Sequence, residues 1–255
     1  MELFNFLNSE KYENLSFDLI FEKAANDPAF RPLFYRKLLE SELFLLTYPT
    51  DAIPQGKSIT DKKTKIKVRF FKTGVIPIFT SRSRIFDGGI IKGQVNYTAL
   101  KASVIFQLFD NKTAFILNPY SNISKELLPE EIGLMKSGNL FGSGEVQEIL
   151  PNENILIGVP AIFSINLVET LKRYFETRPE IKGAYLALIN NKSINDSPHL
   201  LLGIDSLKGT WKEISSELME IARPYLQENE VIDFLDLSEK GELSILVNAK
   251  ELKIY

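Results

Sequence analysis

One glycine-serine break, Gly142-Ser143-Gly144, divides the chain into two stretches that each alternate apolar, strand-like runs with amphipathic, helical runs. Short clusters of glycine and serine between patterned segments mark loops and domain boundaries. With 255 residues, the chain is long enough for two ordinary domains. We therefore predict two α+β domains, residues 1–142 and 143–255, each a mixed or antiparallel sheet with helices packed on it.

In the first half, two helices are predicted before a series of short strands. Apolar side chains recur at helical spacing in residues 16–27, with Ser16 available as the N-cap, and in residues 29–41. Lys65, Lys67 and Arg69 alternate with apolar residues, which predicts a half-buried strand over 64–72 with a basic outer face. The other predicted elements are strands over 42–49, 75–81 and 113–119, a helix over 97–109 and a helix from Leu128.

The second half predicts the order strand, helix, strand, strand, helix, strand, strand. AYLALI (184–189) and HLLLGI (199–204) are short apolar strands separated by a polar turn. Thr210 and Glu213 have the spacing of a capping box, which predicts the start of the second helix. The last two strands, 231–237 and 242–248, are expected to form a hairpin around Glu239-Lys240-Gly241.

Charge and composition limit the classes of partner. The chain has no cysteine, no basic leader before an apolar segment and no run near 18 apolar residues, so we expect a cytoplasmic protein without a membrane span. The net charge of −3 gives no general attraction for nucleic acid. Seven bases stand against one acid in 57–72, and nine acids against three bases in 211–242. These opposite faces could attract partners, or each other in a homodimer.

The sequence shows no recognised catalytic constellation. His199 is the single histidine, and it begins an apolar strand. A thiolate metal site is impossible without cysteine, no cluster of other metal ligands stands out, and no Walker A, GxGxxG or nucleophile-elbow motif occurs. We therefore expect no metal, no cofactor and no enzymatic activity. An enzyme with an unrecognised site built from carboxylates or serine, acting as a hydrolase or transferase, is the alternative.

The best candidate for a binding site is the polar cluster Thr80-Ser81-Arg82-Ser83-Arg84. It follows a buried strand and is expected to open a short helix, where free N–H groups, hydroxyls and guanidiniums suit an anion or a carboxylate. Asn118 and Ser121 follow another strand of the same half, and they would join the cluster if the two strands are neighbours. The alternative is an ordinary N-cap, with both arginines paired to acids of their own domain.

Several short motifs resemble one known family. They are AANDPAFRPLFYRKLLES (24–41), GVIPIFTSRSR (74–84), ILNPYS (116–121), LPEEI (128–132) and, in the second half, 158–189. Together and in this order they resemble the N-terminal and C-terminal domains of the SseB family, named for enhanced serine sensitivity. The resemblance implies a role in amino-acid physiology without an agreed reaction. It favours a non-catalytic binding or regulatory protein, which docks a partner protein or an anionic ligand through Ser81, Arg82, Arg84, Asn118 and Ser121.

Overall fold

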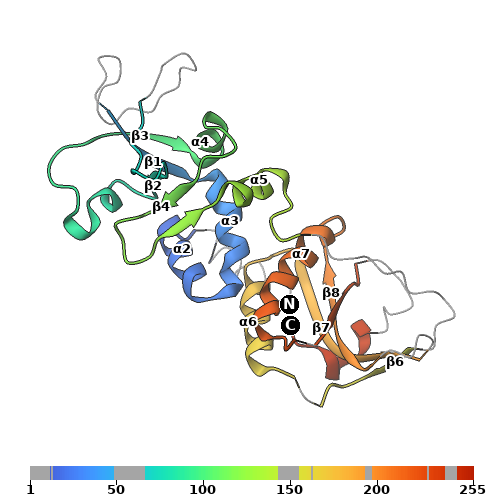
Figure 1. Cartoon of the computed structure of the whole chain (residues 1–255). Helices are drawn as coiled ribbons and strands as arrows, with labels where there is room; N and C mark the ends of the chain where they lie inside the picture. The colour runs from blue at the N-terminus through green and yellow to red at the C-terminus, as the bar shows by residue number, and fades with distance from the viewer. Residues whose placement is uncertain are drawn as a thin grey trace. The chain divides into compact units, whose positions relative to one another are not determined.

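The computed structural model describes residues 12, 14–48, 67–142, 155–161, 163–192, 197–228, 230–238 and 246–255. These residues form two compact units, each with its own sheet and helices (Figure 1). We call them the N unit, residues 16–26 and 31–140, and the C unit, residues 141–255 with Asp27–Phe30 and the first described residues. The predicted α+β class is confirmed for both. No helix in these residues is long and apolar enough to cross a bilayer.

A five-stranded mixed sheet in the order β3-β1-β2-β4-β5 forms the centre of the N unit. All its pairings are antiparallel except that of β2 with β4, which is parallel. Its strands are β1 (Glu42–Thr47), β2 (Ile76–Phe79), β3 (Asn96–Lys101), β4 (Phe115–Leu117) and β5 (Lys125–Leu127). Every residue of β2 is buried, as expected for a continuous apolar strand at the middle of a sheet.

Capping residues, proline and glycine mark the ends of helices in the N unit. They are α2 (Phe17–Asn26), α3 (Arg31–Glu40), α4 (Ala102–Leu108) and α5 (Pro129–Ser137). The hydroxyl of Ser16 accepts a hydrogen bond from the Leu19 amide at 3.3 Å, so the predicted cap of α2 is present. α5 has proline in its first turn, and it ends at Gly138, whose φ of 71° lies in the left-handed region.

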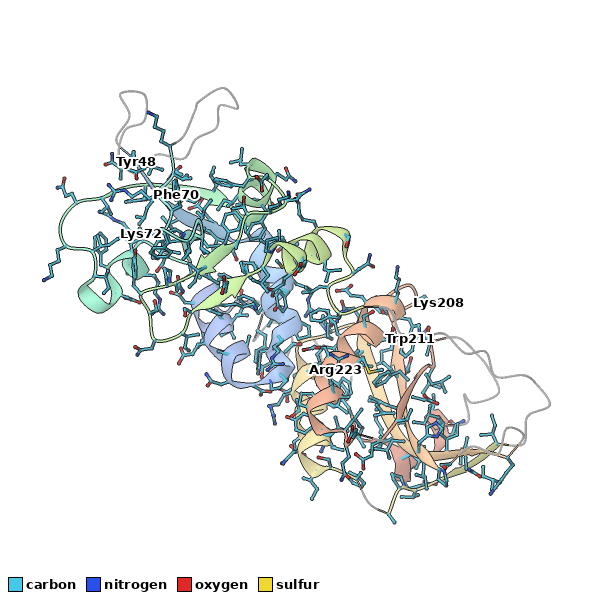
Figure 2. The ribbon with its side chains drawn as sticks, in the orientation of Figure 1. Tyr48, Phe70, Lys72, Lys208, Trp211 and Arg223 are labelled. Carbon is cyan, nitrogen blue, oxygen red and sulfur yellow. The ribbon has the colours of Figure 1, made fainter. Side chains whose placement is uncertain are left out.

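Two sequence predictions for the N unit are wrong. Residues 97–101 belong to strand β3, and the helix begins only at Ala102, because pairing of β3 with β1 along its whole length overrides the helical spacing. Of the strand predicted over 64–72, the part up to residue 66 lies outside the described residues. The remainder forms a single bridge, Val68 to Thr47, and Phe70 is 64% exposed instead of buried. Figure 2 labels Phe70 near Tyr48.

The C unit is built on a four-stranded mixed sheet in the order β6-β7-β8-β9. β7 pairs antiparallel with β6 and β8, and β9 pairs parallel with β8. The strands are β6 (Ile155–Gly158), β7 (Ile181–Asn191), β8 (His199–Ser206) and β9 (Ile232–Asp236), and the helices are α6 (Ile165–Glu176) and α7 (Trp211–Ala222).

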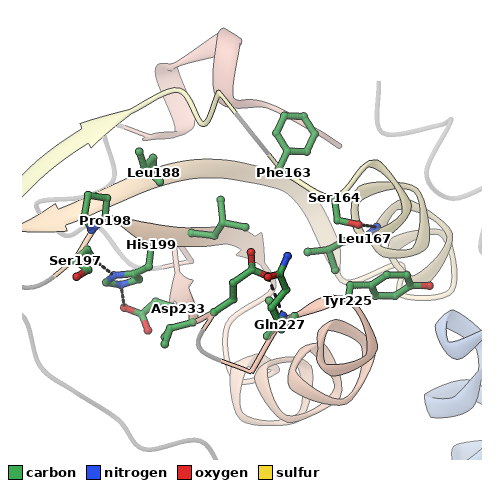
Figure 3. A pocket seen from close by; sticks show the side chains of 14 residues that line it. Phe163, Ser164, Leu167, Leu188, Ser197, Pro198, His199, Tyr225, Gln227 and Asp233 are labelled. Atoms are coloured by element: carbon green, nitrogen blue, oxygen red, sulfur yellow. Dashed lines mark hydrogen bonds and ion pairs between the residues drawn. The ribbon is translucent and has the colours of Figure 1, made fainter.

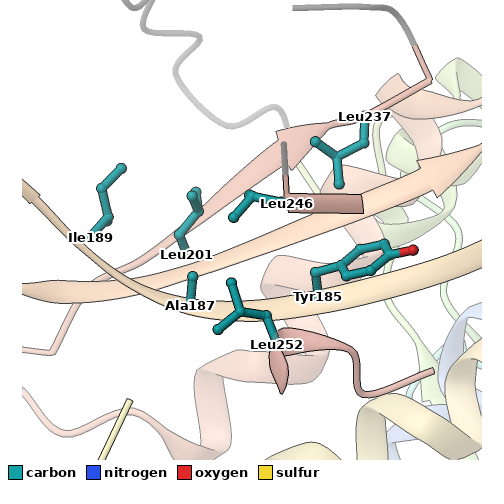
Figure 4. Packing of buried hydrophobic residues seen from close by; sticks show 7 residues of the cluster. All are labelled: Tyr185, Ala187, Ile189, Leu201, Leu237, Leu246 and Leu252. Atoms are coloured by element: carbon teal, nitrogen blue, oxygen red, sulfur yellow. The ribbon is translucent and has the colours of Figure 1, made fainter. Parts of the chain in front are cut away.

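A buried cluster covers one face of this sheet (Figure 4). Tyr185, Ala187 and Leu201 contribute to it from β7 and β8, and Leu237, Leu246 and Leu252 come from the C-terminal segment. The segment approaches so closely that a Cβ at Gly203 would lie 2.8 Å from a methyl carbon of Leu237. A larger residue at this point of β8 would require the Leu237 side chain to shift, so glycine fits the observed packing.

Two predictions for the C unit are also wrong. Residues 246–248 form a 3₁₀ turn that packs on the sheet instead of the end of a last strand, while residues 242–245 of that strand and the proposed turn at 239–241 lie outside the described residues. The capping box is absent because the Thr210 hydroxyl donates to the carbonyl of Leu207 at 2.7 Å. Glu213 is instead drawn to Arg178, 3.0 Å away.

Tyr12 links the start of the chain to the C unit. Its hydroxyl donates to Glu176 Oε2 at 2.9 Å, and its ring meets Phe30 edge-on at 5.4 Å. Burial, followed by the hydrogen bond to Glu176, raises the pKa of Tyr12 to about 12. An unfolded tyrosine titrates near 10, so the unfolded chain loses this proton at a lower pH than the folded chain.

We expect the stability from Tyr12 to be fully present below pH 10 and to be lost as the pH rises from about 10 to about 12. Tyr12→Phe should lower the free energy of unfolding by about 1.5–3 kcal/mol at neutral pH, the usual value of a hydrogen bond to a charged group. The variant should also lose less stability than the parent as the pH rises above about 10. Thermal melts from pH 8 to pH 11.5, with Tyr48→Phe as an exposed control, measure both. Parallel alkaline losses in the parent and Tyr12→Phe would contradict the assignment.

The division of the chain near Gly142 remains a prediction that limited proteolysis can test. We expect the first cuts between about residues 136 and 154 or within 54–63, because exposed connections open first. Tyr12 and Asp27–Phe30 belong to the C unit, so the two fragments should still co-elute in gel filtration after a cut near Gly142. First cleavage inside 97–109, identified by mass spectrometry, would show that the division is wrong.

Candidate functional site

The parallel pairing of β2 and β4 brings together the polar residues that follow these two strands. Ile78 of β2 pairs with Leu117 of β4, so both strands end at the same edge of the sheet. The segment from Thr80 to Arg84 and the segment from Asn118 to Ser121 therefore meet there. The condition on which the predicted shared site depended, that the two strands are neighbours, holds.

Asn118 connects these two segments within the protein. Its side-chain oxygen accepts a hydrogen bond from the Thr80 amide at 2.9 Å, and its Nδ2 donates to the Thr80 hydroxyl at 2.8 Å. The Thr80 hydroxyl in turn donates to Asp18 at the start of α2. Asn118 is 2% exposed and has a φ of 50°, a left-handed conformation that asparagine tolerates better than most residues. These contacts make Asn118 a structural link between strand ends.

Arg84 and Ser121 are held by internal carboxylates. The guanidinium of Arg84 pairs with Asp18 at 3.2 Å and with Asp87 at 3.1 Å. Ser121 donates to the same Asp87 carboxylate at 2.6 Å, and this bond is the main reason that the pKa of Asp87 lies below its ordinary value. The hydrogen bond to Asp87 likewise raises the pKa of Arg84. For Arg84, the alternative prediction of an ion pair with acids of its own domain is therefore confirmed.

Arg82 and Ser81 differ from the other three candidates. The Arg82 guanidinium lies over the Tyr97 ring, 5.4 Å from its centroid, and no described carboxylate pairs with it. Ser81 shares a hydrogen bond of 2.9 Å with Ser83. The 3₁₀ helix from Ser83 to Gly89 has Arg82 at its N-cap and no side-chain cap, so the expected hydroxyl cap is absent. Ligand binding by Ser81 and Arg82 stays a prediction.

A pocket of about 730 Å³ lies in the C unit, at the end of the sheet where β8 and β9 begin (Figure 3). The start of α6, the end of β7 and the turn before β9 complete its wall. Its size is within the range of pockets that hold small molecules or side chains of a partner. The lining consists of Phe163, Ser164, Leu167, Leu188, Ser197, Pro198, His199, Leu200, Tyr225, Leu226, Gln227, Glu230, Val231 and Asp233.

His199 is the centre of the polar side of this pocket. Its Nε2 lies 2.8 Å from Asp233 Oδ2, and its Nδ1 lies 2.9 Å from the backbone oxygen of Ser197. Both ring nitrogens therefore face oxygen acceptors, as the dashed lines in Figure 3 show. A Ser-His-Asp triad needs a serine hydroxyl at one of these nitrogens, and here the serine contributes its carbonyl.

Comparison with known proteins places both units in one family. The profile of the SseB protein N-terminal domain matches residues 20–133, and that of the SseB protein C-terminal domain matches residues 150–250. The chain belongs to the SseB family. Protein SseB of Escherichia coli (strain K12) and Protein SseB of Shigella flexneri are each 29% identical to it over 231 residues, which cover 89% of this chain and 85% of each relative. No solved structure matches.

Within the SseB domains, the strand-end cluster falls in the N-terminal profile and the pocket in the C-terminal one. The sequence indicated the first site because its polar residues are contiguous. It missed the second because the lining is contributed by β7, β8, β9, the start of α6 and the turn before β9. The available signal was that His199 and Asp233 each lie near the start of a strand, and they meet only because those strands are parallel neighbours.

Proposed function

We propose that this SseB-family chain is a non-catalytic binding or regulatory protein of the cytoplasm, and that the pocket beside His199 is where it docks a partner protein. The main support is that several polar side chains of the pocket are already hydrogen-bonded within the protein. His199 lies between two acceptors, the Ser164 hydroxyl accepts from the Leu167 amide, and the Tyr225 hydroxyl is bonded to Thr170. These contacts hold the pocket's polar side chains in one arrangement, and a surface of fixed shape and charge suits the docking of a partner.

Exposed apolar side chains around the pocket favour a protein over a small molecule. Phe163 is 41% exposed and Val231 is 57% exposed, and both line the pocket. Leu156 of β6, Val159 just after it and Ile165, the first residue of α6, are also exposed. Apolar groups that gather beyond a pocket mark surfaces where another chain binds. The link to serine sensitivity that the family name carries would then act through the docked partner.

Site-specific photo-crosslinking in the native cell tests this proposal. A photoreactive residue at position 163 should capture a discrete protein, identified by mass spectrometry, while one at 207 should not. Leu207 is a matched control because it is 49% exposed in the same unit but follows the other end of β8. Val231→Asp should abolish capture from position 163. Equal capture from both positions, or none from 163, would refute docking at this pocket.

An enzyme built on the same pocket is the competing function. Substrate panels for hydrolases and transferases should give no turnover above background with the full chain. Turnover that is reproducible and abolished by His199→Ala, with an unchanged thermal melt, would replace the binding proposal with a catalytic one.

A further inference from the structure

Among the described residues that line the pocket, the charged side chains other than His199 all have one sign. Glu230 and Asp233 are the carboxylates among the lining residues, and no lysine or arginine is among them. Asp233 has a side chain 53% exposed, and it lies next to the single histidine. A site with this charge repels acidic ligands and attracts cations, and complementary charge of this kind governs partner choice and on-rate.

Each of these carboxylates has one oxygen fixed by the fold. Asp233 Oδ2 accepts from His199 at 2.8 Å, and Glu230 Oε2 accepts from the Gln227 amide at 2.9 Å. The second oxygen of each has no hydrogen-bond partner in the described part of the chain. These fixed contacts hold the carboxylates in place, so a cation that binds their second oxygens does not have to order them first. A guanidinium or an ammonium could bind there with charge-assisted hydrogen bonds.

Beside these charged groups and the polar Ser164, Ser197, Tyr225 and Gln227, the pocket has an apolar side. Leu167, Leu188 and Leu200 contribute to this side, and Phe163 and Val231 are the exposed large apolar residues of the lining. Figure 3 shows Phe163 and Leu167 on the side of α6, and His199 with Asp233 on the other side. A ligand that fills this space must therefore carry an apolar group near its cationic group.

We propose that the partner enters this pocket with a basic segment in which an arginine or lysine lies close to an aliphatic or aromatic side chain. This inference rests on the proposed function, because it names the chemistry of the docked partner. The apolar side chain fills the space beside Leu188 and Leu200, and the cation binds Glu230 and Asp233. Exposed apolar side chains next to the lining, such as Ile165 beside Ser164, favour a peptide segment over a small organic cation.

Selection of random twelve-residue peptides on phage against the full chain tests the proposal. The enriched peptides should carry arginine or lysine within a few residues of a large apolar side chain. Measured by fluorescence anisotropy, synthetic copies should bind the Glu230→Gln/Asp233→Asn double variant about tenfold or more weakly, since each lost charge-assisted hydrogen bond has a large effect on affinity. Glu251→Gln, at an exposed acid in the 3₁₀ turn Lys250–Leu252, is the charge control and should leave affinity unchanged.

The other outcomes separate this inference from the proposed function. Peptides without basic residues that lose affinity with Val231→Asp but not with the carboxylate variants would overturn the basic segment and leave docking at the pocket intact. If no selected peptide loses affinity with Val231→Asp, both the basic segment and docking at the pocket are overturned. Arginine ethyl ester is the small-cation probe, and its binding as tightly as the selected peptides would overturn a peptide as the occupant.

Discussion

Replacing Arg178 with methionine should lower the free energy of unfolding of the C unit by about 3–5 kcal/mol, because it leaves a buried carboxylate without its cation. Arg178 is 3% exposed and lies 3.4 Å from Glu217, which is 1% exposed. Burial alone would lower the pKa of Arg178, but Tyr174, Glu217 and Glu180 outweigh burial and raise that pKa above its ordinary value. The guanidinium therefore stays charged, and it neutralises Glu217 inside the protein.

Two matched variants define the origin of this effect. Glu213→Gln removes a partner of Arg178 that is 56% exposed, and it should cost no more than about 1 kcal/mol, as is usual for exposed ion pairs. Arg178→Met combined with Glu217→Gln should recover part of the loss, because the buried charge is removed while the amide oxygen can still accept the hydrogen bond that Tyr174 donates to Glu217 at 2.6 Å. Urea unfolding followed by circular dichroism measures all three. A double variant as unstable as Arg178→Met alone would show that packing, and not the orphaned charge, causes the loss.

Asn118→Ala should lower the free energy of unfolding of the N unit by about 2–4 kcal/mol. The side chain accepts from the Thr80 amide and donates to the Thr80 hydroxyl, and a buried donor without an acceptor costs about 1–3 kcal/mol. Alanine would also have to adopt the φ of 50° found at this position, which adds about 1–2 kcal/mol. Chemical denaturation of the full chain measures the loss.

Asn118→Gly separates the backbone conformation from the hydrogen bonds. Glycine adopts a positive φ without steric cost, so Asn118→Gly should be about 1 kcal/mol more stable than Asn118→Ala while still losing both side-chain bonds. If alanine is tolerated as well as glycine, the left-handed backbone is not a constraint. If neither variant destabilises the protein, the structural role of Asn118 is wrong, and its predicted part in ligand binding gains support.

Much of the N unit could be predicted because its elements carry strong local signals. The continuous apolar run of β2 and the proline in the first turn of α5 determine these elements without help from the rest of the chain. β3 could not be predicted in this way. Its apolar residues recur at a spacing that suits a helix, and only the pairing of residues 96–101 with β1 selects the strand.

The two sites also differ in what the sequence could predict and what required the tertiary structure. The polar residues near Arg84 and Asn118 are visible in the sequence as strand-end clusters. Only the tertiary structure shows that Arg84 forms ion pairs with Asp18 and Asp87. In the C unit, no local pattern connects His199 with Asp233, which are 34 positions apart. The sequence by itself determined the family, the two-sheet α+β architecture and the lack of cysteine chemistry. Strand pairing decided which side chains meet, because hydrogen bonds and ion pairs act over a few ångströms in space, whatever the separation along the chain.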